Sequence, residues 1–270
     1  MNKLNKALTR RFYTLHWVLF FVLLQSCTSL NTFDTLASLS QDGLSLHTIF
    51  KHQTLYAESL NKNDHLAIFI EGDGTPWIKN KHIAKDPSPD NPLLLKFIKQ
   101  YSGNLLYLGR PCYFNTHDPL CHFKYWTSHR YNEQVVKSMV LAVKETLKVK
   151  KYKRLTLVGH SGGGTLARLM ACEFNIPVNL ITLAANLDTN AWTKHHGWTP
   201  LFGSLNPVHD TKPCPNLNES HFHGDLDKVV PMHLNDKYFE THQINQIVVE
   251  NQNHTDWSNF WPTLNQILPP

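Results

Sequence analysis

The stretch Leu155-Thr156-Leu157-Val158-Gly159-His160-Ser161-Gly162-Gly163-Gly164-Thr165 decides the fold. Its apolar first part predicts a buried strand, and Thr165–Glu173 predicts a helix. Between them the pattern G-x-S-x-G places Ser161 on a sharp strand-to-helix turn, with glycines that allow close approach of neighbouring chains. A phosphate-binding turn would need a lysine, or a longer glycine motif with an acid on the next strand, and neither is present. We therefore predict that Ser161 is a catalytic nucleophile.

Strand-like and helix-like segments alternate along the rest of the chain. This alternation predicts an α/β fold with a mostly parallel central sheet and helices on both faces. The segment 186–214 contains three prolines and is predicted to be an irregular cap or insert. The predicted strands are Leu44–Phe50, Thr54–Leu60, His65–Ile70, Asn104–Leu108, Arg154–Val158, Val178–Ala184, Ser220–His223 and Ile244–Glu250. Helices are predicted over Leu93–Tyr101, Gly162–Glu173 and Thr255–Leu268. A further helix, capped by Ser128, is predicted to bury Val135, Met139, Val143 and Leu147.

The first 26 residues have the composition of an export signal. Four basic residues without any acidic residue precede an apolar stretch from Leu15 to Leu24, which is too short to span a bilayer. Removing these four from the 26 basic residues of the chain leaves 22 against 21 acidic ones. Four of the five net positive charges therefore belong to this segment, and the remaining charge of about +1 argues against a nucleic-acid-binding surface. The four basic residues are Lys3, Lys6, Arg10 and Arg11.

The end of that segment, Leu24-Gln25-Ser26-Cys27, resembles the lipobox of bacterial lipoproteins. The resemblance implies a signal peptide over residues 1–26 and acylation of Cys27. A polar tether (27–43) would then join the membrane to one domain over 44–270. Thr28 follows the cysteine, which in such lipoproteins favours the outer membrane, with the domain facing the periplasm or the exterior. Ordinary signal cleavage and a retained membrane anchor are the alternatives.

Four further cysteines lie in the part of the chain that would be exported to an oxidising compartment. Cys112 and Cys121 flank one loop, and we expect a disulfide between them, although three pairings of the four cysteines are possible. Cys172 falls within a predicted helix and is expected to be buried there. Cys214 completes the set.

Residues 44–268 resemble the α/β-hydrolase superfamily, whose members order their triad as nucleophile, acid and histidine. The family pattern G-x-x-D-x-x-V-P falls on Gly224 and Asp227, so the resemblance implies that Asp227 is the acid. Asp225, two residues earlier in the same turn, is one alternative. Asp188 is another, because it follows the preceding strand, where some members place the acid. His254 follows the last predicted strand and is implied to be the catalytic base.

The resemblance also implies an oxyanion hole with two backbone N–H donors. One comes from Gly162, directly after the nucleophile. The other comes from the loop Glu71-Gly72-Asp73-Gly74, where lipases begin with His-Gly. The second donor is then Asp73 or Gly74, and we expect Asp73.

Several segments are similar to a group of bacterial α/β-hydrolase lipoproteins of undefined substrate: Ile70–Trp77, Gly109–Cys112, Trp126-Thr127 and Asn186–Asp188 with Trp192. The implied function is a membrane-anchored serine hydrolase that cleaves carboxylic esters, with a small molecule or a lipid as substrate and no cofactor. Amidase, peptidase and thioesterase chemistry would use the same residues. The tryptophans Trp77, Trp126, Trp192 and Trp198 either line a substrate pocket or pack within loops.

Two other classes of function remain open. The pattern His221-x-His223-x-Asp225 imitates part of a metallohydrolase ligand set, to which His195 and His196 could add. Alternating residues of a strand explain the pattern better, and we expect no metal site. A lipid-anchored binding or envelope-assembly protein with an inactive triad is the third class.

Overall fold

The computed structural model describes residues 46–60, 63–114, 118–211 and 214–269. The predicted signal peptide, Cys27 and the predicted tether lie outside these residues. Within the described part of the chain, no helix has the length and apolar character needed to cross a membrane.

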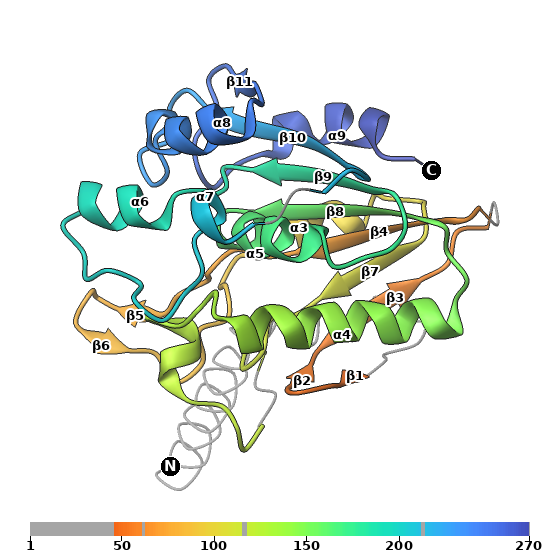
Figure 1. Cartoon of the computed structure of the whole chain (residues 1–270), viewed down its shortest axis with the longest axis horizontal. Coiled ribbons are helices and arrows are strands. Elements are labelled where there is room, and N and C mark those ends of the chain that lie inside the picture. The colour runs from red at the N-terminus through yellow and green to blue at the C-terminus, as the bar shows by residue number, and fades with distance from the viewer. Residues whose placement is uncertain (1–45, 61–62, 115–117, 212–213, 270) are drawn as a thin grey trace, which may run out of the picture.

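A seven-stranded sheet forms the centre of the molecule (Figure 1), in the order β11-β10-β9-β8-β4-β7-β3. All neighbouring strands are parallel except β3 and β7, which pair antiparallel at one edge. The strands of this sheet are β3 (Thr54–Ala57), β4 (His65–Ile70), β7 (Leu105–Leu108), β8 (Arg154–His160), β9 (Val178–Leu183), β10 (Leu217–Gly224) and β11 (Gln246–Val249). Two separate hairpins consist of β1 (Leu46–His47) with β2 (Lys51–His52), and β5 (Trp77–Ile78) with β6 (His82–Ile83).

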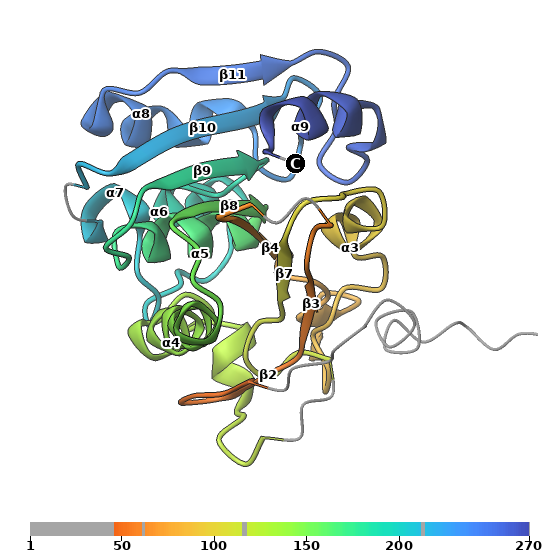
Figure 2. The same ribbon diagram turned by 90° about the vertical axis from the view of Figure 1, so that its right-hand side faces the viewer.

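Helices cover both faces of the sheet (Figure 2). Helices α3 (Leu93–Ile98) and α9 (Trp261–Ile267) lie together on one face, where the rings of Phe97 and Trp261 are 5.1 Å apart. The helices of the other face include α4 (Glu133–Val149), α5 (Gly162–Ala171) and α8 (Asp236–His242). The predicted architecture is thus confirmed. The remaining helices are α6 (Thr189–His195), α7 (Pro207–Asp210) and the short 3₁₀ helices η1 (Phe123–Trp126), η2 (Met232–Asn235) and η3 (Ser258–Phe260).

Burial on both faces explains why the central strands are continuous apolar runs in the sequence. Every residue of β4 is buried, and so is every residue of β8 after Arg154. The chain passes from β4 to β7 on one side and then returns to β8 on the other side of β4. The strand order reverses at this point, and in open α/β sheets ligands bind at the carboxyl ends of the strands beside such a reversal.

Several predicted boundaries are wrong for local reasons. Leu44–Phe50 is not one strand: within its described part, only β1 is extended, and Thr48 N–H donates to the Phe50 carbonyl in the turn that leads to β2. Helix α4 begins after Asn132, whose side chain accepts the Val135 N–H, and not after Ser128. Ser128 instead interacts with His129.

The segment 186–214 contains two short helices, α6 and α7, between irregular stretches. Asp188 and Asn206 cap them, so the order in this segment comes from side chains that accept backbone N–H groups. The predicted C-terminal helix is divided into η3 and α9.

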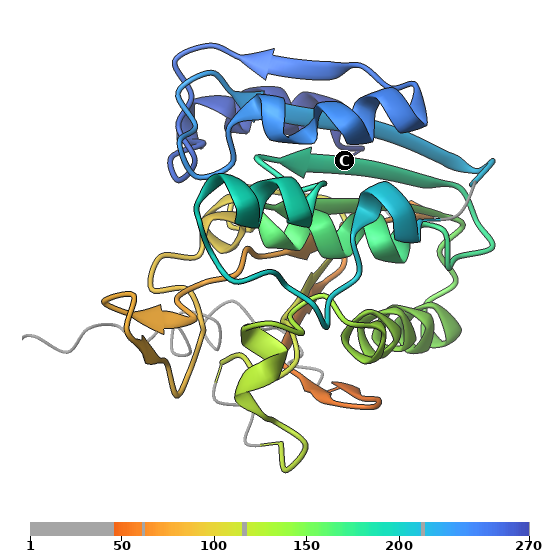
Figure 3. The same ribbon diagram turned by 60° about the vertical axis from the view of Figure 1, so that its left-hand side comes forward.

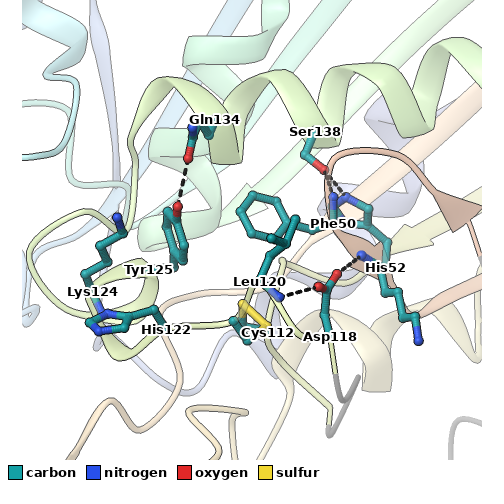
Figure 4. Close-up of a disulfide and its surroundings, with 12 residues drawn as sticks. Phe50, His52, Cys112, Asp118, Leu120, His122, Lys124, Tyr125, Gln134 and Ser138 are labelled. Atoms are coloured by element: carbon teal, nitrogen blue, oxygen red, sulfur yellow. Dashed lines mark hydrogen bonds between the residues drawn. A yellow bond between two sulfur atoms is a disulfide. The ribbon is translucent and has the colours of Figure 1, made fainter.

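The cysteines differ in their surroundings. Cys112 and Cys121, which are nine residues apart in the sequence, form a disulfide that closes one loop. Figure 4 shows this loop against the strand β2: the Asp118 carboxylate accepts the N–H groups of Lys51 and Leu120 at 2.6 and 2.8 Å. Cys172 is not buried within a helix as predicted. It is half-buried at the C-terminal end of α5 and interacts with the thiol of Cys214.

Candidate active site

Ser161 occupies a sharp turn between β8 and α5 and has φ 50° and ψ −124°. This backbone conformation is rare for a residue with a side chain, and it projects the serine from the carboxyl edge of the sheet. The turn is tight: a Cβ added at Gly163 would lie 2.1 Å from the Ile70 carbonyl oxygen, and one at Gly159 would lie 2.5 Å from Gly164. The glycines around Ser161 are therefore required by the close approach of β4 and α5.

Two further side chains reach Ser161 from other loops at the same edge. His254 lies after β11, and its Nε2 is 3.0 Å from the Ser161 hydroxyl. Asp227 lies after β10, and its Oδ2 is 2.7 Å from His254 Nδ1. Since an ionised carboxylate only accepts, Nδ1 carries the imidazole proton and Nε2 is left to accept the hydroxyl proton. The three residues form one hydrogen-bonded chain.

The surroundings of Asp227 fix the direction of its carboxylate. Its side chain is fully buried, and Oδ1 accepts the N–H groups of Val229 and Val230, both at 2.8 Å. Only Oδ2 is then directed to His254. The carboxylate position is set by the loop backbone, independently of the histidine.

The other two carboxylates left open by the sequence lie elsewhere. Asp225 is exposed and accepts the Gln252 N–H at 3.1 Å. Asp188 caps α6 by accepting the N–H groups of Asn190 and Ala191. Of the three candidates, the structure brings Asp227 to His254.

His254 is held by neighbours that sequence reasoning did not identify. The carbonyl oxygen of His254 accepts an N–H from His160 Nε2 at 2.8 Å and another from Trp257 Nε1 at 3.2 Å. Burial and the nearby His254 lower the pKa of His160 to about 3, so this imidazole is neutral. His160 precedes the nucleophile directly, and its hydrogen bond ties the turn of Ser161 to the loop of His254. The strand–turn–helix motif contains this residue, but its pattern gives no role to the position.

The loop after β4 lies against Ser161, as the predicted oxyanion hole requires. A Cβ at Gly72 would lie 3.3 Å from Ser161 Cβ, and a Cβ at Gly162 would lie 2.1 Å from Asp73 Oδ1. Gly74 faces a different part of the molecule, the chain at Pro87 and Pro89. Of these two residues, Asp73 thus places its side chain against the serine turn.

The Asp73 side chain is the centre of a buried charged cluster. Its carboxylate accepts hydrogen bonds from Arg110 at 2.5 Å, Arg130 at 2.8 Å and the Tyr131 hydroxyl at 2.6 Å. The side chains of the two arginines are only 2% and 8% exposed. Burial alone would raise the pKa of Asp73, but the arginine charges outweigh it and hold the pKa well below its usual range. Two positive charges therefore face one negative charge beside Gly162.

Glu71, at the start of the same loop, fastens it to the adjacent helix. Its buried carboxylate accepts the Leu95 N–H at 2.9 Å, at the N-terminal end of α3. The residue before that helix is Pro92, whose side chain offers no cap. Burial raises the pKa of Glu71 to about 7, although the backbone hydrogen bonds of α3 oppose this shift.

The histidines of the possible metal motif belong to the core. His221 Nδ1 is 2.8 Å from the Thr182 hydroxyl, and His221 Nε2 is 3.1 Å from Glu219. Both nitrogens of His223 are buried without a hydrogen-bond partner. Within the described ranges, no three His, Cys, Asp or Glu side chains are grouped in a way that could hold a metal ion.

The four tryptophans divide into two kinds. Trp126 and Trp192 are buried, and their indole N–H groups donate to the carbonyls of Ala84 and Val229. Trp77 and Trp198 are about half exposed, at 41% and 50%. Trp198 stacks on the His196 ring at 4.3 Å.

The chain matches no family model and no curated protein. Among solved structures it is similar to an esterase of Pyrococcus furiosus, with a TM-score of 0.58 and 13% identity over 86% of this chain and 90% of that one. A protein of unknown function from Agrobacterium tumefaciens, described as an α/β hydrolase, gives 0.57 and 13% over 83% and 93%. An α/β serine hydrolase homologue from Coxiella burnetii gives 0.52 and 11% over 84% and 95%. These likenesses and the sheet order lead to one conclusion: the chain has the α/β-hydrolase fold.

Proposed function

We propose that this protein is a serine hydrolase that cleaves carboxylic esters through an acyl-enzyme on Ser161. The observation that carries the proposal is the continuous hydrogen-bonded chain from Asp227 through His254 to the Ser161 hydroxyl, at 2.7 and 3.0 Å. Its three members come from three loops at one edge of the sheet, and the hydrogen bonds orient each for the next step. This arrangement is the one that nucleophilic catalysis by serine needs.

In the first half of the reaction, Ser161 Oγ attacks the ester carbonyl carbon while His254 Nε2 takes the hydroxyl proton. The new Oγ–C bond moves an electron pair of the C=O bond onto the oxygen. Collapse of this intermediate breaks the bond to the alcohol oxygen, which leaves with the proton from His254. Water, deprotonated by His254, then attacks the acyl carbon. The C–Oγ bond breaks, Ser161 Oγ takes the proton back from His254, and the carboxylic acid leaves. Asp227 stabilises the imidazolium that forms in both halves.

The oxyanion would be stabilised by the N–H groups of Gly162 and Asp73. Gly162 begins helix α5, whose N-terminal N–H groups and dipole favour negative charge. The carboxylate of Asp73 beside Gly162 would oppose an oxyanion if it were alone. Its ion pairs with Arg110 and Arg130 leave one excess positive charge in the cluster, which favours the developing anion.

A fluorophosphonate probe tests the nucleophile without a known substrate. It should label the wild-type protein and fail to label Ser161→Ala, while Ser102→Ala, at an exposed loop position, serves as the matched control and should be labelled normally. On short p-nitrophenyl esters, Ser161→Ala should lower kcat by about 10³-fold or more. Wild-type turnover in Ser161→Ala would overturn the proposal. If the protein cleaves amides or thioesters faster than esters in the same assay, the substrate class changes, but Ser161 stays the nucleophile.

We also propose that acylation of Cys27 anchors the domain to the cell envelope, on the outer membrane more than the inner. The proposal rests on the lipobox-like sequence before Cys27 and on the basic and apolar segments that precede it. Metabolic labelling with a palmitate analogue should mark the wild-type protein and spare Cys27→Ala. Equal labelling of the two proteins would refute the anchor.

A further inference from the structure

The hairpin of β5 and β6 is an exposed tip that the sequence analysis did not predict. Every residue from Trp77 to Ile83 is exposed, including three large apolar side chains. Trp77, Ile78 and Ile83 are 41%, 49% and 36% exposed, and Trp77 pairs directly with Ile83 across the two strands. A short hairpin with this much apolar surface in water gains stability when that surface is covered.

The shape of the hairpin is fixed by its turn and by its base. Lys79 and Asn80 both have positive φ, 51° and 55°, as the two central residues of a tight hairpin turn require. The Lys81 N–H closes this turn on the Ile78 carbonyl at 3.1 Å. At the base, buried Ala84 is held by the Pro76 carbonyl and by the indole N–H of Trp126. The tip therefore stands out on a base that is packed into the domain.

The charges on this stretch are all of one sign. Residues 74–85 contain Lys79, Lys81 and Lys85, with His82 between them, and no Asp or Glu. The three lysines are exposed, as are the apolar side chains beside them. The surface that would bind this tip must accept apolar groups and carry negative charge nearby.

The hairpin lies at the edge of the sheet that carries the candidate active site. It follows the loop of Gly72 and Asp73 directly and projects beyond the carboxyl ends of the strands (Figure 3). Other exposed apolar side chains belong to loops at this edge, among them Leu226 and Val229 on either side of Asp227. A surface bound by the tip would therefore face Ser161.

We propose that the hairpin 77–83 docks the domain onto an anionic lipid bilayer, with Trp77, Ile78 and Ile83 inserted at the level of the headgroups. Trp is favoured at this depth, and lysines beside inserted apolar groups bind anionic headgroups. The apolar side chains occur on both faces of the hairpin, since Trp77 and Ile78 are consecutive strand residues and point to opposite sides. A tip that is apolar on both faces fits a fluid bilayer better than it fits one protein surface.

The test uses quenching of tryptophan emission by brominated acyl chains, because this measures contact at the hairpin even if the N-terminal segment also binds lipid. The full chain is mixed with phosphatidylcholine vesicles that contain phosphatidylglycerol, with and without brominated chains. Part of the quenching should disappear in Trp77→Phe, and Ile78→Ser should weaken it. Val149→Ser is the matched control: Val149 is 77% exposed at the opposite edge of the domain, at the end of α4, and its loss should change nothing.

The charged part of the proposal is tested separately. Replacing Lys79 and Lys81 by Gln should weaken association of the hairpin with phosphatidylglycerol vesicles about 25-fold, since each lysine near an anionic surface contributes roughly 5-fold. Equal quenching in Trp77→Phe and wild type would overturn the proposal, and the hairpin would then be expected to bind a protein instead of a bilayer. Quenching through Trp77 that is unaffected by salt, by the lysine changes or by removal of phosphatidylglycerol would overturn the anionic preference. Ser161→Ala should be quenched normally, so the outcome is independent of the proposed catalysis.

Discussion

Replacement of Asp227 by Asn tests how the candidate triad is oriented. The substitution keeps the size of the side chain, and the two N–H groups of Val229 and Val230 still need an acceptor at 2.8 Å. They will hold the amide oxygen of the asparagine, because the opposite orientation would place its NH₂ against two donors. The NH₂ group is then directed to His254 Nδ1, where the carboxylate stood.

The consequence is a change of tautomer. Facing a donor, His254 Nδ1 must accept, so the imidazole proton moves to Nε2 and points at the Ser161 hydroxyl. The imidazole can no longer take the serine proton at the distance of 3.0 Å that the structure gives. In a serine protease with this arrangement the same change costs about 10⁴-fold in kcat, which corresponds to roughly 5 kcal/mol of transition-state stabilisation. We expect a loss of this order here.

The assay compares kcat on a p-nitrophenyl ester for the wild type, Asp227→Asn and Asp225→Asn, with circular dichroism to establish that each variant is folded. Asp225→Asn is the matched control two residues away. It removes charge only at an exposed carboxylate that accepts the Gln252 N–H, so we expect less than about a tenfold effect. Asp227→Asn that keeps a tenth of the wild-type kcat, or a larger loss in Asp225→Asn, would refute the assignment of the acid.

Two further predictions concern stability. Burial raises the pKa of Glu71 to about 7 in the folded protein, so the unfolded chain loses this proton first as the pH rises from about 4.5. The free energy of unfolding should therefore fall as the pH rises from about 4.5 to 7, by roughly 3 kcal/mol in all. Glu71→Gln should abolish this dependence in denaturant titrations at several pH values, and an unchanged slope relative to wild type would contradict it. The Cys112–Cys121 disulfide should contribute about 3 kcal/mol by closing its loop, so Cys112→Ala with Cys121→Ala should lower the free energy of unfolding by that amount. The same loss should appear when the wild type is reduced, and equal stability of oxidised and reduced protein would rule it out.

The sequence predicts the parts of this fold that depend on local pattern. The turn of Ser161 is visible because a buried strand, a glycine-rich turn and a helix are adjacent in the chain. The strands β4, β8 and β9 are visible because burial on both faces makes most of their residues apolar. Asp227 and His254 became candidates through the order of residues in the hydrolase superfamily, not through local pattern.

What the sequence did not predict depends on contacts between distant segments. Arg110 and Arg130 lie 37 and 57 residues beyond Asp73, and no periodicity connects them. Glu71 accepts the Leu95 N–H across 24 residues, so its role as a helix cap follows only from the packing of α3. The hairpin at Trp77 was missed because its turn is formed by Lys79 and Asn80, without the glycine that marks most such turns.

Because His254 follows an edge strand, the candidate active site is sensitive to denaturant. Strand β11 pairs only with β10, and its central residues Ile247 and Val248 are 41% and 47% exposed. Such a strand can detach by local opening, at a smaller free-energy cost than global unfolding. Detachment would carry His254 away from Ser161 while the strands from β3 to β10 stay paired. Activity should therefore be lost at denaturant concentrations at which most amide protons of β4 and β8 are still protected from exchange.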